Sequence, residues 1–304
     1  MTKPPALESL DAAEFRCGVV AVVGRPNVGK STLVNALVGA RISITSKRSQ
    51  TTRHRIRGIL TTAAAQFIFV DTPGFQTEHR SALNARMNRA VRESLTGIDA
   101  TVLVVEPPVL SRADRDVVAL LPAGVPVVAV VNKVDRLADK ASLLPLIAEI
   151  SALRDFVAIV PISAEKQWLL DDVTAEIAKL LPIGPALYPA EELTDRDERF
   201  LAAEFIREKI FRRLGKEVPY ATTVTIDQFA QEGKLRRIQA KVVVTKASQR
   251  AILLGEGGER MKEIASSARR DMERLFGGKV FLEVRVRVES GWASDERALD
   301  RLGY

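Results

Sequence analysis

The stretch CGVVAVVGRPNVGKS, residues 17–31, decides the fold of the first half of the chain. Its Val-rich part, 17–24, is an apolar run that ends in glycine, which is typical of a buried parallel strand. The remainder has the spacing G-x-x-x-x-G-K-S and runs into a helical pattern at 31–39. Backbone N–H groups of such a loop, with the helix N-terminus behind them, can surround a phosphate. The sequence therefore predicts a phosphate site; the alternative is a glycine-rich turn that binds nothing.

The loop also carries the side chains that a bound nucleotide needs. Lys30 is expected to bridge the β- and γ-phosphates, and the Ser31 hydroxyl to ligate Mg²⁺. The residues predicted to bind the nucleotide here are Gly24, Arg25, Pro26, Asn27, Val28, Gly29, Lys30, Ser31 and Thr32.

Further short apolar runs alternate with helical patterns. Strands are expected at 66–70, 100–105, 125–131 and 156–162, and helices at 31–39 and 138–153. This alternation predicts an α/β domain with a mostly parallel sheet and helices on both faces. In such sheets ligands bind at the carboxyl ends of the strands, which is where polar motifs occur in this sequence.

The element Asp71-Thr72-Pro73-Gly74 directly follows the run 66–70. An Asp at a strand end can hold Mg²⁺ through water, and a glycine can offer its N–H to a γ-phosphate. Alone, D-x-x-G more often marks a turn. After a phosphate-binding loop it predicts metal binding by Asp71 and a catalytic contact from Gly74.

A third element, Asn132-Lys133-Val134-Asp135, identifies the base. The two oxygens of Asp135 match the N1–H and 2-amino donors of guanine, whereas adenine would leave them unpaired. Such unpaired buried groups reject the wrong base by large factors, often ~10⁴. Ser163 and Ala164 end the next apolar run, and the Ala164 N–H is expected to reach guanine O6.

Together these motifs resemble a GTPase of the translation-factor-related superfamily, with residues 15–182 as its domain. The resemblance implies that Thr52, in preference to Thr51, joins Ser31 and Asp71 around Mg²⁺ when GTP is bound. Phe75 stands where many such enzymes have a glutamine that orients water, so hydrolysis is expected to be slow without a partner. Asn27 is expected either to help bind K⁺ beside the phosphates or only to cap the local backbone.

The rest of the chain predicts a second domain with a basic surface. A Pro-rich, charged stretch, 183–198, is expected to be a linker that packs loosely or spans two lobes. Residues 196–304 contain 23 Lys/Arg and 17 Asp/Glu, and so carry most of the net charge of +7. An excess of this kind suits a polyanionic partner or is simply a solvated surface. The single Cys17 excludes an intrachain disulfide and fits a reducing cytosol.

The order of elements expected over 199–304 is one helix, two strands, two helices and one strand. A glycine loop, 255–258, joins the two adjacent helices, and residues 234–250 contain basic residues without one acid, as in a phosphate track. The loop is either a helical hairpin turn or the G-x-x-G of a KH domain, here of type II, which clamps single-stranded nucleic acid. The residues predicted to bind RNA are Arg250, Gly255, Glu256, Gly257, Gly258, Arg260 and Lys262. Glu256 is expected to weaken a phosphate contact.

A GTPase domain followed by a KH domain resembles the bacterial Era family. The resemblance rests on GRPNVGKS, DTPGF and NKVD, on the segments 42–55, 193–210 and 215–224, and on the end SGWASDERALDRLGY. It implies binding of GTP or GDP with Mg²⁺, binding of the 3′ end of 16S rRNA, and a role in maturation of the small ribosomal subunit. It also implies a monomer in the cytoplasm, with peripheral association with the inner membrane. Two alternatives stay open: an RNA-binding module with negligible turnover, and a membrane-surface GTPase.

Overall fold

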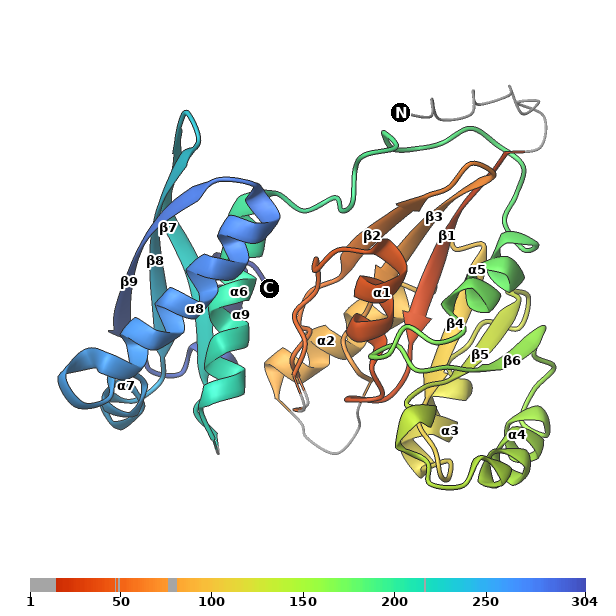
Figure 1. The fold of residues 1–304 in the computed structure, drawn as a ribbon. Coiled ribbons are helices and arrows are strands. Elements are labelled where there is room, and N and C mark those ends of the chain that lie inside the picture. The colour runs from red at the N-terminus through yellow and green to blue at the C-terminus, as the bar shows by residue number, and fades with distance from the viewer. Residues whose placement is uncertain (1–14, 47, 49, 76–80, 216) are drawn as a thin grey trace.

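The computed structural model describes residues 15–46, 48, 50–75, 81–215 and 217–304. Two layered domains lie side by side, joined by a long connection that runs along one end of the molecule (Figure 1). We call them the N-terminal domain, from β1 to α5, and the C-terminal domain, from α6 to α9.

The N-terminal domain contains a sheet of six strands among the described residues, in the order β2-β3-β1-β4-β5-β6. Five of them are parallel, and β2 pairs antiparallel with β3 at one edge. The predicted α/β class with a mostly parallel sheet is therefore confirmed. The strands are β1 (Arg16–Val23), β2 (Ile56–Thr61), β3 (Ala65–Asp71), β4 (Ala100–Val105), β5 (Val127–Val131) and β6 (Ala158–Pro161).

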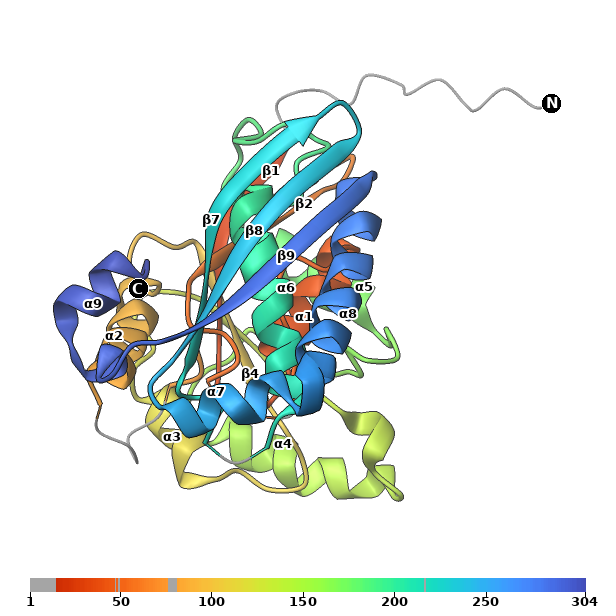
Figure 2. The ribbon, with the colours of Figure 1, turned by 90° about the vertical axis from the view of Figure 1, so that its left-hand side faces the viewer.

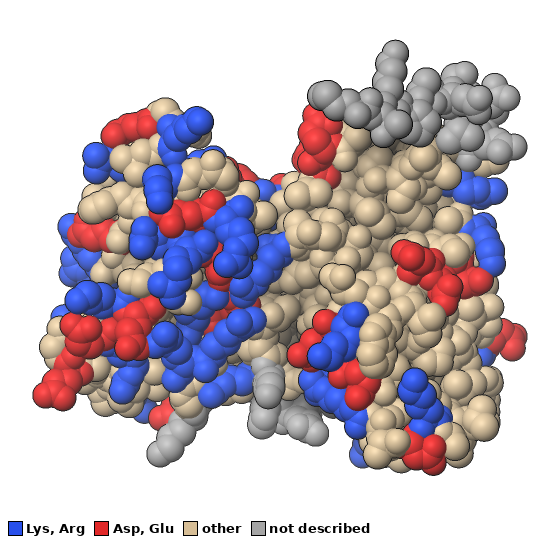
Figure 3. Space-filling view, viewed as in Figure 1, with Lys and Arg blue, Asp and Glu red and all other residues tan. Residues whose placement is uncertain are grey.

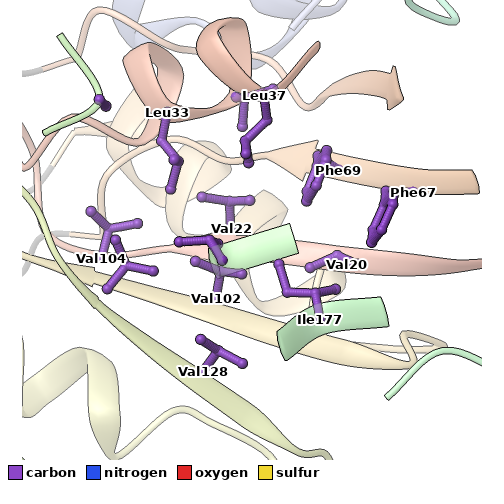
Figure 4. Packing of buried hydrophobic residues seen from close by; sticks show 14 of the residues in the cluster. Val20, Val22, Leu33, Leu37, Phe67, Phe69, Val102, Val104, Val128 and Ile177 are labelled. Carbon is purple, nitrogen blue, oxygen red and sulfur yellow. The ribbon is translucent and has the colours of Figure 1, made fainter. Parts of the chain in front are cut away.

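Helices cover both faces of this sheet. On one face, α1 and α5 pack over side chains such as Val20, Val22 and Phe69 (Figure 4). On the other, α2, α3 and α4 pack over the alternate side chains of the same strands, among them Ala21 and Leu103. The central strands are thus buried on both faces, which explains their continuous apolar sequence. The helices are α1 (Lys30–Val38), α2 (Ala82–Glu93), α3 (Arg112–Val118), α4 (Leu143–Ser151) and α5 (Leu170–Ala178).

One expectation for this domain needs correction, and one strand was not expected. The helix expected over 138–153 is shorter, because a 3-10 turn (Lys140–Ser142) precedes α4, whose first turn contains Pro145. Proline is tolerated only near the start of a helix, so the helix begins close to it. Strand β2 was not among the expected strands, since its sequence, IRGILT, has only weak alternation of polar and apolar residues.

The connection between the domains does not pack loosely. Leu187 and Tyr188 donate backbone N–H groups to the side chain of Gln66 on β3. Farther along, the Ile59 N–H of β2 donates to the Leu193 carbonyl, and Arg196 donates to the Arg55 carbonyl. The linker therefore follows the open edge of the N-terminal sheet until two residues before α6 begins.

The C-terminal domain has the predicted order of elements from α6 to β9, and a short helix that was not predicted, α9, follows. Its three-stranded sheet has the order β7-β8-β9, with β8 and β9 parallel, and α6 and α8 cover one face (Figure 2). This is the arrangement expected of a type II KH domain. Its elements are α6 (Glu198–Arg213), β7 (Thr222–Glu232), β8 (Leu235–Val244), α7 (Ala247–Leu254), α8 (Glu259–Phe276), β9 (Lys279–Val288) and α9 (Glu296–Arg301).

Helix α6 is buried around most of its circumference. Leu201, Phe205 and Ile210 are buried, as is Leu214 just after the helix, but at 3.6 residues per turn Leu201 and Ile210 lie on opposite sides and share no single apolar face. Four charged residues of the helix are buried as well: Glu204, Arg207, Glu208 and Lys209. Charged side chains are almost never fully buried unless paired, so these four are paired within the helix or with other parts of the protein.

Candidate nucleotide-binding site

The carboxyl ends of the N-terminal strands surround a cavity of about 860 Å³ that also reaches the C-terminal domain. The structure brings ten of the predicted residues to its wall: Pro26, Asn27, Gly29, Lys30, Ser31, Thr32, Thr52, Gly74, Asn132 and Lys133. At two glycines of this wall the neighbouring chain comes too close to leave room for a side chain. A Cβ at Gly74 would lie 2.6 Å from the Pro26 Cα, and one at Gly29 would lie 2.3 Å from the Asn132 Nδ2.

Lys30 lies in the phosphate-binding loop with its ammonium group buried. Its Nζ donates to the carbonyls of Gly24 and Arg25, at 3.0 and 2.9 Å. Burial lowers the pKa of Lys30 to about 8, and the nearby Asp71 carboxylate opposes that shift only in part. A buried ammonium without a full counter-charge suits an anionic ligand such as a phosphate.

The three predicted metal ligands meet beneath this loop. The Ser31 and Thr52 hydroxyl oxygens lie 2.7 Å apart. Asp71 is fully buried, and neither of its carboxylate oxygens has a hydrogen-bond partner among the described residues. Burial raises the pKa of Asp71, against the influence of the Ser31 hydroxyl and the Lys30 charge. An unpaired buried carboxylate beside two hydroxyls is a donor set that fits Mg²⁺.

The structure also separates Thr52 from its neighbour. The Thr51 hydroxyl is engaged by Ser46 Oγ and the Arg48 carbonyl, at 2.6 and 2.7 Å, away from Ser31. Phe75 packs into the apolar core beneath the sheet, with the Arg92 guanidinium 5.9 Å from the centre of its ring. No water-orienting group therefore stands at that position.

The base-reading element is held by bonds to the phosphate-binding loop. Asn132 donates to the Val28 carbonyl, and the Lys133 Nζ donates to the Asn27 carbonyl, at 2.9 and 2.6 Å. One oxygen of Asp135 is buried without a partner among the described residues, as expected of a group that awaits guanine donors. The Ala164 N–H differs from expectation, because it donates to Asn132 Oδ1 at 3.0 Å. A contact with guanine O6 would have to share or replace that bond.

Several predicted residues support the site from behind its wall. The Thr72 hydroxyl donates to the Val22 carbonyl, and Val28 is buried in the apolar core. Arg25 does not face the cavity, since its guanidinium pairs with Asp114 and Glu106. The other predicted residues that do not form the cavity wall are Gly24, Asp71, Pro73, Asp135, Ser163 and Ala164.

The sequence did not predict the part of the cavity wall that comes from α6 and from residues outside the nucleotide-binding motifs. Phe211 and Arg212 of α6 line the cavity, and Arg212 donates to the Thr45 carbonyl and hydroxyl at 3.1 and 2.9 Å. Glu106, Arg136 and Glu165 complete the opening near the base-reading element. No local motif marks α6, because its residues reach the cavity only through the arrangement of the domains.

The predicted RNA-binding loop lies between α7 and α8. Its three glycines have φ values of 73°, 55° and 83°, which favour glycine at Gly255, Gly257 and Gly258. Behind them the first turn of α8 leaves N–H groups directed at the loop, as expected for a phosphate contact. Arg250, Glu256, Arg260 and Lys262 are exposed around it, and Lys262 pairs with Glu259 at 3.4 Å.

The expected phosphate track over 234–250 is partly wrong. Arg236 is buried in a two-point ion pair with Glu198 of α6, so it holds the fold together. Arg237 and Lys241 pair with Glu232 and Asp227, at 2.9 and 3.2 Å. These acidic partners come from α6 and β7, and therefore from outside residues 234–250. Exposed basic side chains gather over α8 and the face around it (Figure 3): Arg270, and Lys262 and Arg274, which pair with Glu259 and Asp271 of the same helix.

Comparison with known proteins agrees with this geometry. A family model described as "50S ribosome-binding GTPase" matches residues 19–133, and one described as "KH domain" matches residues 217–293. A protein of Nitrosomonas eutropha named GTPase Era is 51% identical over 97% of this chain and 100% of its own length. The chain belongs to the Era family of GTPases.

Two solved Era structures share its fold from end to end. One is Aquifex aeolicus Era Y63A bound to GDP·AlF4⁻, and the other is Era with MgGDPNP and nucleotides 1506–1542 of 16S ribosomal RNA. Each has a TM-score of 0.92 and 34% identity, and covers 95% of this chain and 99% of its own. Because the match spans both domains, their relative arrangement here is that of the Era structures with bound nucleotide. Among the described residues, no helix is both long and apolar enough to cross a bilayer.

Proposed function

We propose that the protein binds GTP with Mg²⁺ and hydrolyses it to GDP and phosphate. The observation that carries this proposal is the unpaired buried carboxylate of Asp71 beside the Ser31 and Thr52 hydroxyls. A metal ion bound there would offset the charge of the phosphates. Lys30 supplies a second positive charge, and the Gly74 N–H is available to a γ-phosphate.

Recognition of guanine is assigned to Asp135, with Asn132 and Lys133 holding the base-reading element against the loop. Because Phe75 is packed into the core, we propose that turnover is slow until a partner or a cation supplies what that position lacks. K⁺ beside the phosphates is one such cation. Asn27 lines the cavity and is exposed, so it is the proposed K⁺ contact.

We further propose that the C-terminal domain binds the 3′ end of 16S rRNA and that the protein acts in assembly of the small ribosomal subunit. The support is the whole-chain likeness to Era with nucleotides 1506–1542 of 16S ribosomal RNA. We give it more weight than the 50S named in a family model that matches residues 19–133 alone. The proposed contacts are Arg250, Gly255, Glu256, Gly257, Gly258, Arg260 and Lys262.

The remaining proposals concern organisation. We propose the boundaries 15–182 for the GTPase domain, 183–198 for the linker and 199–304 for the KH domain, and a monomer that works in the cytoplasm with ribosomal particles. Peripheral association with the inner membrane is proposed as a secondary property. Sedimentation with anionic vesicles, with and without competing RNA, tests it: vesicle binding that RNA does not affect would favour a membrane-surface role.

One set of measurements tests the main function. Binding of GDP, of a non-hydrolysable GTP analogue, and of RNA copying nucleotides 1506–1542 is measured at stated salt, and turnover is measured with and without RNA in KCl and in NaCl. Lys30→Ala should abolish nucleotide binding and leave RNA binding, whereas Gly258→Asp should do the reverse. Absence of nucleotide binding by the unaltered protein would refute the proposal, and an equal rate in both salts would remove K⁺ from it.

A further inference from the structure

Arg53 follows Thr52 in the chain but belongs to a different environment. Whereas Thr52 lies beside Ser31, the Arg53 guanidinium is buried in the C-terminal domain with 3% of the residue exposed. Its two terminal nitrogens donate to four oxygens, at 2.8 to 3.2 Å. These are the carbonyls of Pro219, Tyr220 and Thr222 and the hydroxyl of Tyr304. Because consecutive Cα atoms are about 3.8 Å apart, Thr52 cannot move far without displacing Arg53.

Arg53 is received by three carbonyls of residues 219–222 and by Tyr304 of the segment 290–304, which we call the tail segment. The Tyr304 ring stacks against His54 and Trp292, with centroids 4.9 and 5.9 Å away. Its hydroxyl donates to Thr223 Oγ1 at 2.9 Å. Trp292 is fully buried, and its Nε1 donates to the Ala221 carbonyl. The tail segment is therefore fixed to the start of β7, and through β7 to the sheet of the C-terminal domain.

The tail segment also holds α2, the helix that follows Gly74 in the chain. Arg86 of α2 donates to the Tyr304 carbonyl and to Asp300, both at 2.7 Å. Leu83 and Met87 of α2 pack in one apolar cluster with Trp292, Leu299 and Leu302. Figure 2 shows α9 lying beside α2. One segment of the C-terminal domain thus contacts the residue after Thr52 and the helix after Gly74, the two places expected to respond to a γ-phosphate.

The hydrogen bonds of Arg53 favour two distinct positions of its side chain, docked and withdrawn. If the guanidinium left this site, the three carbonyls would lose their donor. If it moved only part of the way, it would be a buried charge without acceptors. Intermediate positions are therefore costly, and the residue is either docked or withdrawn. The aromatic rings of Phe211 and Tyr304, 5.6 and 5.8 Å from its central carbon, add to the docked state.

We propose that Arg53 is a positioning residue that couples the nucleotide state at Thr52 to the C-terminal domain, with residues 219–222 and the tail segment as the receiving elements. The proposal rests on the GTP and RNA binding proposed above. While Thr52 is held beside Ser31, Arg53 stays docked and the domains keep the arrangement described here. When Thr52 withdraws, Arg53 leaves its acceptors and the C-terminal domain is free to reorient. Such coupling is reciprocal, so RNA that favours this arrangement also favours a bound γ-phosphate.

The test measures affinity for RNA copying nucleotides 1506–1542 in two states, with protein loaded with GDPNP and with GDP. For the unaltered protein we expect the two affinities to differ by about tenfold or more, within the usual range of allosteric coupling. Arg53→Met and Tyr304→Ala should bring the two affinities to within about twofold of each other, and the double variant should lose no more than either single one. Arg55→Met is the matched control, because the Arg55 side chain is half exposed and pairs with Glu93, at 3.8 Å, rather than with the C-terminal domain.

Two further measurements distinguish a role of Arg53 in coupling the two sites from a general loss of structure in the variants. GDP affinity, which depends on the phosphate-binding loop, should stay within about threefold of the unaltered value in all variants. Tyr304→Phe, which keeps both ring contacts, should retain most of the difference between states. If Arg53→Met fails to fold, Tyr304→Ala tests the same contact from the other side.

An unchanged difference between states in the folded variants would overturn the proposal. Equal RNA affinity in both states of the unaltered protein would also overturn it, while leaving GTP and RNA binding intact. Failure of the unaltered protein to bind nucleotide or RNA at all would instead refute the proposed function.

Discussion

Buried charge is treated in opposite ways at the nucleotide site and at the contact between the domains. At the nucleotide site, Asp71 keeps both oxygens unpaired within the described structure, and Asp135 keeps one. At the contact between domains, the terminal nitrogens of Arg53 have four acceptors, and its Nε alone is left without a partner among the described residues. There Glu208 accepts from the Thr45 N–H and pairs with Arg41 and Lys209.

The difference shows which buried charges await a ligand and which hold the fold together. An unpaired buried carboxylate destabilises the protein until something binds it, whereas a paired one stabilises the geometry around it. Burial alone would not separate the two sets, since Asp71 and Glu208 are both 0% exposed. The hydrogen-bond partners separate them.

The largest effect is expected from Asp71→Asn. Turnover of GTP should fall by about 10²–10³, the usual loss when a group that stabilises transition-state charge is removed. The nucleotide-free protein should nevertheless become more stable, because a buried carboxylate with a raised pKa is replaced by a neutral amide of the same shape. Single-turnover kinetics and urea unfolding measure the two effects. A variant that loses stability along with activity would contradict the reading of Asp71 as unsatisfied.

Asp135→Asn should change the preferred base. The amide presents a donor where guanine also donates, so affinity for GTP should fall by about 100-fold or more while xanthosine triphosphate gains. Competition binding with both nucleotides measures the switch. Unchanged GTP affinity would place the guanine contact elsewhere.

A smaller effect is expected on nucleotide affinity when the pH is raised through the pKa of Lys30. Its pKa of about 8 in the nucleotide-free protein should rise when phosphate binds, since an adjacent anion favours the charged form. The affinity for nucleotide is then highest below pH 8, where Lys30 is charged. It falls as pH rises through that value, by about tenfold between pH 7.5 and pH 9. Isothermal titration across this range tests it. A constant affinity would mean that the ammonium is not the phosphate contact.

The smallest effect concerns His54 at the contact between domains. Burial, against the opposite charge of Glu204 and with the like charges of Arg207, Arg196 and Arg53, lowers the pKa of His54 to about 4. The unfolded chain takes up this proton near pH 6.5 and the folded one only near pH 4, so stability is lost as pH falls between them. We expect a loss of about 1 kcal/mol from pH 7 to pH 5.5. Thermal unfolding of the protein and of His54→Phe, which should lack this component, measures it.

The same contrast explains what the sequence could predict. Each nucleotide-binding motif is four to eight residues long and sits at a strand end, so its role follows from local spacing. The apolar face of β8 follows from its alternating residues in the same way. Arg53, Glu204 and Arg207 look in the sequence like ordinary surface charges, because the residues that surround them lie up to about 250 positions away. The docking of α9 on α2 depends on such distant pairs as well, whereas β2, which pairs with the next strand β3, is hard to predict only because its sequence alternates weakly.

The hydrogen bonds that fix the linker along β2 and β3 have a consequence for how far the domains can separate. An open sheet edge invites pairing with other chains, and this segment covers it. Arg196 is bonded to the Arg55 carbonyl, and α6 begins at Glu198. The tether is thus almost without slack, so the C-terminal domain turns about a short pivot when its contacts open. Redocking then occurs within one molecule at a high effective concentration, and it does not depend on how dilute the protein is.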